Sequence, residues 1–302
     1  MRTVLLCCWL LAAWPVFAGE RVVDTDGQEI VVGKPFSRII SLYPAHTENL
    51  FSLGLEPEVI GVADSDDYPP AVAGKVRYNY REDPEKFIAA RPDLVLIRPM
   101  IARGSADFVR KLRAAGSTVV SLQPNTPEEI YAYWRVLGIL TGREAEAAAM
   151  AGRFQRELAA IRARVDAIPP SARKKVYFES IHAKMKTFAP RSIAMFCLES
   201  AGGINVAADA LQVRSTNIAE YGKERILARG GEIDVFLAQQ GRMNPVQIAT
   251  IVDEPGFGAI RAVEEGRVHL IDEELVSRPT VRLLDGIREI HRLLYGPAGS
   301  GS

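Results

Sequence analysis

The chain has 302 residues, with 37 lysines and arginines against 37 aspartates and glutamates, so its formal net charge is zero. This balance excludes the strongly basic character of a nucleic-acid-binding protein, and we expect no nucleic-acid partner. A chain of this length provides enough apolar surface for a large core, and two lobes are its natural division.

The N-terminus carries the pattern of a secretory signal peptide. Arg2 precedes the apolar run 4–17, and small residues lead to a cleavage site after Ala18. The run is too short for a comfortable membrane span, so an uncleaved anchor is the weaker alternative. Cys7 and Cys8 lack the small-residue context of a lipoprotein site. We therefore expect residues 1–18 to be removed and the rest to be a soluble exported protein.

The remaining chain contains a single cysteine, Cys197, which lies in an apolar pattern. This setting predicts a buried thiol rather than a metal ligand or a nucleophile, and no disulfide framework is possible. At the other end, residues 299–302 (GSGS) predict a flexible tail.

The first half of the chain, residues 19–140, alternates short apolar strands with helices. A hairpin is expected around Asp26 and Gly27. The expected strands are 38–42, 59–62, 93–97 and 118–122, and the expected helices are 49–53, 83–90, 107–115 and 128–140. Strands that alternate with helices predict an α/β lobe with a largely parallel sheet.

Residues 141–167 predict one long helix. Thr141 and Glu144 have capping-box spacing, and apolar residues then recur every three or four positions from Ala147 to Val165. The pair Pro169-Pro170 ends the pattern. About 25 residues make a rod of about 35 Å, long enough for a rigid connection between two lobes. An ordinary surface helix of a single domain is the alternative.

The second half, residues 169–298, repeats this organisation. Its expected strands are 175–179, 204–207, 234–237 and 267–271, its expected helices are 192–201, 257–263 and 281–294, and a polar loop is expected at 180–191. The segment 222–229 (GKERILAR) is similar to 83–91 (DPEKFIAAR), and an Asp-led apolar strand follows each. This weak internal repeat favours two lobes of similar build.

Five segments resemble the substrate-binding proteins of ABC importers for ferric siderophores, haem and vitamin B12. They are 38–54 (RIISLYPAHTENLFSLG), 66–70 (DDYPP), 85–97 (EKFIAARPDLVLI), 202–206 (GGINV) and 262–272 (AVEEGRVHLID). The resemblance covers nearly all of the exported chain. It implies an α/β fold of two Rossmann-like lobes with mostly parallel sheets, joined by one long rigid helix, with a ligand held between the lobes. It also implies a periplasmic protein, expected to be a monomer, that works without a cofactor.

Loops that follow the expected strands supply the candidate ligand contacts, because ligands of open α/β sheets bind at the carboxyl ends of the strands. Tyrosines offer a flat apolar face with one hydroxyl, and arginines offer paired donors for oxyanions. Each such residue taken alone is more often a surface residue. The candidates are Tyr43, Pro44, His46, Tyr68, Tyr78, Tyr80 and Arg81 from the first half, and Met185, Lys186, Phe188, Tyr221, Arg242, Arg278 and Arg282 from the second.

Glu85 and Glu224 open the two repeated helices. The resemblance implies that one exposed acidic residue on each lobe docks onto arginines of the membrane permease, which couples the protein to the ATPase. The alternative is a carboxylate that only stabilises the start of its helix, which contributes about 0.3–1 kcal/mol.

Basic residues in the second half indicate an anionic ligand, so we expect a ferric siderophore-like metal chelate. A corrinoid ranks next, then haem with His46, Tyr43 or Met185 as an axial ligand, then an oxyanion such as molybdate. A two-lobed enzyme is the alternative of a different class. It is disfavoured because the four histidines lie far apart and no catalytic motif is present.

Overall fold

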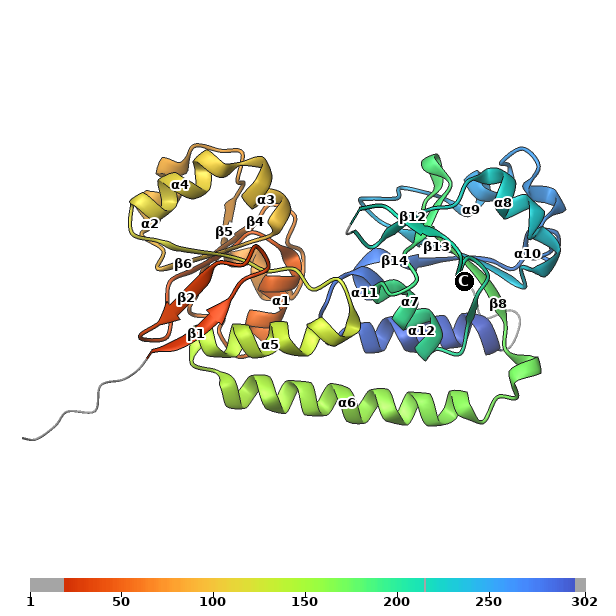
Figure 1. The fold of residues 1–302 in the computed structure, drawn as a ribbon, viewed down its shortest axis with the longest axis horizontal. Helices are drawn as coiled ribbons and strands as arrows, with labels where there is room; N and C mark the ends of the chain where they lie inside the picture. Colours follow the sequence, from red (N-terminus) through yellow and green to blue (C-terminus); the bar gives the residue numbers. More distant parts are fainter. Residues whose placement is uncertain (1–18, 215, 297–302) are drawn as a thin grey trace, which may run out of the picture.

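The computed structural model describes residues 19–214 and 216–296, so the predicted signal peptide and tail lie outside the described residues. Figure 1 shows two lobes side by side, each built around a sheet, with the long helix α6 (Glu144–Asp166) running beneath both. The predicted fold class is therefore confirmed, while the lobe boundaries at residues 140 and 168 stay predictions. Within the described ranges, no helix is long and apolar enough to cross a bilayer.

The first lobe contains a five-stranded parallel sheet in the order β5–β4–β3–β6–β7. Its strands are β3 (Ile39–Ser41), β4 (Val59–Ala63), β5 (Val76–Tyr78), β6 (Leu94–Ile97) and β7 (Thr118–Ser121). Strands β3 and β6 are buried along their whole length, as continuous apolar runs predict for a parallel sheet covered on both faces. The connecting helices are α1 (Pro44–Ser52), α2 (Pro84–Ala90), α3 (Pro99–Gly104), α4 (Ala106–Ala114) and α5 (Pro127–Thr141). The predicted hairpin is formed by β1 (Glu20–Val23) and β2 (Glu29–Val32).

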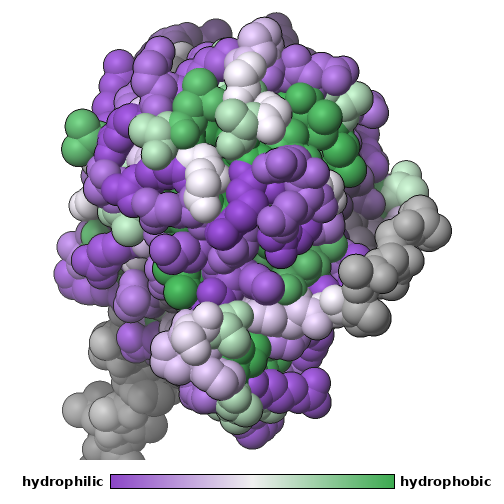
Figure 2. Space-filling model, turned by 90° about the vertical axis from the view of Figure 1, so that its right-hand side faces the viewer, coloured by the Kyte–Doolittle hydropathy of each residue, from purple (hydrophilic) through white to green (hydrophobic). Residues whose placement is uncertain are grey.

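The second lobe has a mixed sheet. Its parallel part consists of β8 (Lys175–Ile181), β10 (Ile204–Asn205), β13 (Val235–Gln240) and β14 (Val268–Asp272). An antiparallel extension adds β9 (Lys186–Phe188), β12 (Ile218–Glu220) and β11 (Leu211–Gln212). The helices are α7 (Ile193–Ser200), α8 (Lys223–Ala228), α9 (Ile248–Val252), α10 (Arg261–Glu264), α11 (Glu273–Ser277) and α12 (Leu283–Tyr295). Figure 2, which views the end of this lobe, shows polar and apolar side chains interspersed on its surface.

Short 3-10 helices complete the chain: η1 (Pro70–Gly74), η2 (Pro170–Ala172), η3 (His182–Lys184), η4 (Gly230–Glu232) and η5 (Phe257–Ala259). The prediction of a polar loop at 180–191 was wrong, because β8 and β9 form a hairpin there. Thr187 and Phe188 are buried in it, and the Thr187 hydroxyl donates to the carbonyl of Phe178 at 2.7 Å. The apolar signal of this strand is too short to stand out from its polar neighbours.

The long helix begins three residues later than predicted, because Thr141 ends α5 instead of capping α6. The Thr141 hydroxyl donates to the carbonyl of Leu137 at 2.7 Å, which satisfies the last turn of α5. Gly142 then adopts φ 66°, the left-handed conformation that terminates helices. The stripe predicted for α6 is buried as expected at Met150, Phe154 and the other core-facing positions.

Helix α1 starts at Pro44 rather than at residue 49. Proline fits the first helical position because its fixed φ suits a helix and its missing N–H needs no partner there. Residues 44–46, expected in a loop, therefore belong to a helix whose first turns are buried.

One apolar core continues beneath both lobes. It joins Trp134 of α5, Phe154 of α6 and Ile287 of α12, and the Trp134 and Phe154 rings lie 5.3 Å apart between centroids. A smaller cluster fills the upper part of each lobe, around Phe236 in the second and Phe87 in the first.

Candidate functional site

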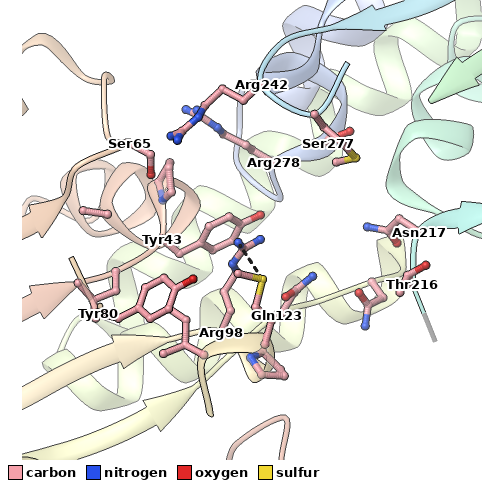
Figure 3. Close-up of a pocket in the computed structure, with 18 of the residues that line it drawn as sticks. Tyr43, Ser65, Tyr80, Arg98, Gln123, Thr216, Asn217, Arg242, Ser277 and Arg278 are labelled. Carbon is pink, nitrogen blue, oxygen red and sulfur yellow. Dashed lines mark hydrogen bonds between the residues drawn. The ribbon is translucent and has the colours of Figure 1, made fainter. Parts of the chain in front are cut away.

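A cavity of about 860 Å³ lies between the lobes and takes its lining from both. Figure 3 shows Tyr43, Tyr80, Arg98 and Gln123 of the first lobe facing Asn217, Arg242 and Arg278 of the second. Arg98, Gln123 and Arg242 follow β6, β7 and β13, so the cavity opens at the carboxyl ends of these strands.

Tyr43 and Arg98 form a stacked pair in the wall of the cavity. The guanidinium carbon of Arg98 lies 4.4 Å from the centre of the Tyr43 ring. Burial raises the pKa of the Tyr43 phenol, and the positive charge of Arg98 opposes this only in part, so the hydroxyl stays protonated at neutral pH. Arg98 also donates to the sulfur of Met100 at 3.7 Å, the dashed contact in Figure 3. Its Nε is buried without a hydrogen-bond acceptor among the described residues.

The charged side chains of the cavity wall are mostly cationic. They are Arg81, Arg98, Arg103, Arg242 and Arg278 against Asp64 and Glu273. Both acidic side chains already accept hydrogen bonds, Asp64 from the Asn79 amide and Glu273 from the Met243 backbone, each at 3.0 Å.

Three of the cavity arginines have no carboxylate partner among the residues that the structure describes. Arg81, Arg98 and Arg242 make no ion pair within the described part of the chain, although Arg81 stacks on Tyr80 and Arg98 stacks on Tyr43. A guanidinium without a counter-charge is a ready partner for an oxyanion, because it offers several donors in one plane. The cavity is therefore suited to a negatively charged molecule.

A cluster of ion pairs joins the lobes beside the cavity. Nε and Nη2 of Arg282 donate to the two carboxylate oxygens of Glu48 at 2.8 and 2.9 Å. The same guanidinium lies 4.0 Å from the centre of the Tyr68 ring. The amide of Asn49 donates to the carbonyl of Pro279 at 3.0 Å, which adds an uncharged link between the lobes.

The sequence also matches known proteins over most of its length. A family model described as "Periplasmic binding protein" matches residues 39–275. The chain belongs to the periplasmic binding protein family. This confirms the family predicted from the sequence.

Three relatives illustrate the range of this periplasmic binding protein family. An uncharacterized ABC transporter substrate-binding lipoprotein of Bacillus subtilis, YvrC, is 27% identical over 282 residues, which cover 90% of this chain and 84% of that protein. A cobalamin-binding protein of Halobacterium salinarum is 25% identical and is matched over 87% of this chain and 70% of its own length. The crystal structure of a possible iron-binding, periplasmic solute-binding protein from Staphylococcus epidermidis has a TM-score of 0.74 and 26% identity, and the match covers 87% of this chain and 100% of that one.

Eight of the predicted contact residues line the cavity of this periplasmic binding protein: Tyr43, Pro44, Tyr78, Tyr80, Arg81, Phe188, Arg242 and Arg278. Tyr78 is itself 4% exposed and packs on Phe87, with ring centroids 4.7 Å apart, so much of its side chain belongs to the core. That the eight residues contact ligand stays a prediction.

His46 was predicted at the site but is a core residue. It is fully buried, its Nδ1 lies 2.7 Å from the Tyr133 hydroxyl, and its Nε2 lies 3.1 Å from the carbonyl of Ile97. A carbonyl only accepts, so Nε2 carries the proton and Nδ1 accepts from Tyr133. Burial lowers the pKa of His46 to about 3, so the ring is neutral at physiological pH. His46 also lies outside the cavity lining.

Five further candidates lie outside the cavity lining, each with partners elsewhere. Tyr68 and Arg282 stack on each other in the inter-lobe cluster. Lys186 pairs with Glu220 at 2.6 Å. Tyr221 is buried against Tyr177 in the apolar cluster around Phe236, and Met185 packs against that cluster. The structure thus places these five outside the cavity lining, and that they contact ligand stays a prediction. The sequence does not show which way a side chain on a short strand or turn points.

Several residues of the cavity wall were missed: Arg98, Met100, Gln123, Asn125, Thr216, Asn217, Met243 and Ser277. Arg98 directly follows the buried strand β6, so the rule that selects residues after strands was sufficient to find it. Thr216 and Asn217 had no such signal, because the β11–β12 hairpin that presents them was not predicted.

Proposed function

We propose that this protein is the periplasmic solute-binding component of an ABC importer, and that it captures an anionic metal chelate of the ferric siderophore type between its lobes. The observation that carries the proposal is that three guanidinium groups of the cavity, those of Arg81, Arg98 and Arg242, make no ion pair with any described residue. A chelate with carboxylate or catecholate groups supplies the missing negative charge. The chelate is cargo, and we propose no cofactor and no catalytic role.

The size and lining of the cavity support this ligand class. A volume of about 860 Å³ lies in the range of small-molecule sites and far exceeds what a molybdate-sized oxyanion fills. Tyr43 and Tyr80 offer aromatic faces beside Arg98 and Arg81, so an aromatic chelating group can stack while its oxygens meet guanidinium donors.

A corrinoid is the second candidate, favoured by the likeness to the Halobacterium cobalamin-binding protein. Cobalamin carries a single phosphodiester charge, so it supplies fewer anionic groups than the three guanidiniums of Arg81, Arg98 and Arg242 can bind. The cavity lining also offers no tryptophan within the described residues to stack on a corrin ring. Haem ranks third, because His46 is buried and Met185 lies outside the lining, which leaves Tyr43 of the three proposed axial ligands.

A thermal-shift panel on the purified protein tests the ligand class. It includes ferric citrate, a ferric catecholate, a neutral ferric hydroxamate, cobalamin, haemin and molybdate. A ligand present at about 100 times its dissociation constant adds about 2.7 kcal/mol of stability, which raises the melting temperature by several degrees. We expect a rise with an anionic ferric chelate that weakens with added salt. A rise with cobalamin alone contradicts the proposed ligand.

Glu85 and Glu224 are the proposed docking residues for the permease. Each is exposed in the first turn of its helix, α2 or α8, and neither has an ion-pair partner within the described residues. Figure 1 shows α2 and α8 on the side of the two lobes that faces away from α6. Both carboxylates are therefore able to meet one flat partner at the same time.

The double variant E85Q/E224Q tests docking separately from ligand binding. We expect uptake in cells to be lost while the affinity of the purified protein for its chelate is unchanged. The matched control is E144Q/E146Q, which removes two acidic residues from the first turn of α6 on the opposite side. A parallel loss of affinity, or equal loss of uptake in the control, rules out the docking assignment.

A further inference from the structure

Arg278 is held from both lobes at the wall of the cavity. Its Nη2 donates to Oε1 of Glu274 at 2.6 Å within the second lobe, and its Nη1 donates to Oδ1 of Asp67 at 3.1 Å across the gap to the first. Arg278 is buried and lines the cavity beside Arg242 (Figure 3). Its guanidinium is thus a fixed cation of the cavity wall with a carboxylate of the opposite lobe on one side.

The two carboxylates on Arg278 differ in how firmly they are placed. The Glu274 side chain is 19% exposed and also accepts from Nη2 of Arg282 at 3.2 Å. The Asp67 side chain is 58% exposed, so it can leave Arg278 and return to water at little cost. Asp67 is therefore the exchangeable partner of Arg278, and Glu274 is the permanent one.

A more deeply buried ion pair still joins the two lobes when Asp67 leaves Arg278. Glu48 is 1% exposed and binds Arg282 through both carboxylate oxygens. Arg282 lies four residues after Arg278, across the short turn between α11 and α12, so this contact between the lobes persists near the guanidinium that changes partner.

We propose that Asp67 occupies the place on Arg278 that an anionic oxygen of the ligand takes, so that a carboxylate or catecholate group displaces it. This inference rests on the proposed function and assigns Asp67 as a residue that sets affinity and specificity. An anionic chelate competes with an internal carboxylate and then bridges Arg278 to the first lobe in its stead. A neutral ligand leaves the pair intact and gains nothing from Arg278.

A double-mutant cycle tests the exchange. The variants are D67N, R278Q and D67N/R278Q, with ferric citrate and metal-free citrate as anionic probes and titration calorimetry as the assay. We expect D67N to tighten citrate binding about two- to fivefold, the measure of one exposed ion pair. The same change in the R278Q background has no effect, because no guanidinium remains to be released. D107N, at an exposed aspartate paired with Arg110 outside the cavity lining, is the matched control and leaves affinity unchanged.

The alternatives give different results. If Asp67 acts only by repelling the anion through space, its removal tightens binding equally in both backgrounds, and the exchange is refuted. If D67N binds citrate no more tightly than the unmodified protein does, the exchange is also refuted. In that case the binding of ferric citrate by the unmodified protein still supports the proposed function. If the unmodified protein binds neither citrate probe, Arg278 is no citrate subsite and the exchange is refuted, whereas the proposed function falls only if the ferric catecholate of the thermal-shift panel also fails to bind. Should R278Q not fold, E274Q/R278Q replaces it as the charge-free background, since the partly buried Glu274 is then no longer left as an unpaired carboxylate.

Discussion

The Glu48–Arg282 pair yields a sharp stability prediction. The variant R282M keeps an apolar stem on the Tyr68 ring but removes the charge, which leaves Glu48, 1% exposed, with no cation. Burial by itself lowers the pKa of Arg282, but the hydrogen bonds and charges of Glu48 and Glu274 outweigh it and raise that pKa above its ordinary value. The pair is thus tightly coupled in the native state.

Removing one member of a buried ion pair costs about 3–5 kcal/mol, because the other charge stays desolvated. For a protein of this size, that loss lowers the melting temperature by about 6–10 °C. The variant E48Q costs less, since Arg282 keeps Glu274 at 3.2 Å. The double variant E48Q/R282M recovers part of the loss because no charge is then left unpaired.

Thermal unfolding of the three variants followed by circular dichroism measures these differences. The expected order of melting temperatures places R282M lowest and the double variant above it. If the two single losses simply add in the double variant, the cost does not arise from the ion pair and the reasoning is refuted.

Three other predictions concern buried groups. Burial lowers the pKa of His46 to about 3, whereas a free histidine has a pKa of ~6.5. As the pH falls below ~6.5, the imidazole therefore takes up a proton in the unfolded chain but not in the native protein. The free energy of unfolding therefore falls by about 1.4 kcal/mol per pH unit below about 6.5. Urea titrations at several pH values should show a smaller slope for H46Q than for the unmodified protein. Equal slopes in the two proteins contradict this prediction. Burial also raises the pKa of the Cys197 thiol, so a thiol reagent should label it only in denaturant, and rapid native labelling contradicts this. A Cβ on Gly286 would lie 2.1 Å from the carbonyl oxygen of Leu275, so G286A should cost about 1–3 kcal/mol in urea unfolding. G258A, where a Cβ meets nothing within 4 Å, is its control, and equal effects contradict the steric argument.

The alternation of strands and helices was predictable because it depends on local chemistry. Asp83 caps α2 by accepting from the backbone of Glu85, and Ser192 caps α7 by accepting from Met195, as their residue types predict. The fully apolar run 94–97 specifies a buried parallel strand for the same local reason. Cys197 is buried as its apolar neighbours indicated.

The cavity wall was only partly predictable, because lining depends on where a side chain points after folding. His46 looked like a loop residue beside Tyr43, but Pro44 starts a helix whose turn directs the imidazole into the core. From the sequence, Arg282 was expected to bind an anionic ligand. In the structure its guanidinium pairs with Glu48, which lies 234 residues away in the sequence. Arginine alone cannot reveal whether its counter-charge belongs to the protein or to a ligand.

The core that continues from Trp134 through Phe154 to Ile287 has a consequence for how the protein unfolds. The apolar face of α6 is shared, so neither sheet can lose its packing on that helix without exposing part of the other's. Heat or denaturant should then melt both lobes in one cooperative transition, unlike a pair of domains on a flexible linker. A fragment that stops at the end of α6 would present half of that face to water and favour association. The helix that joins the lobes thus also makes them a single thermodynamic unit.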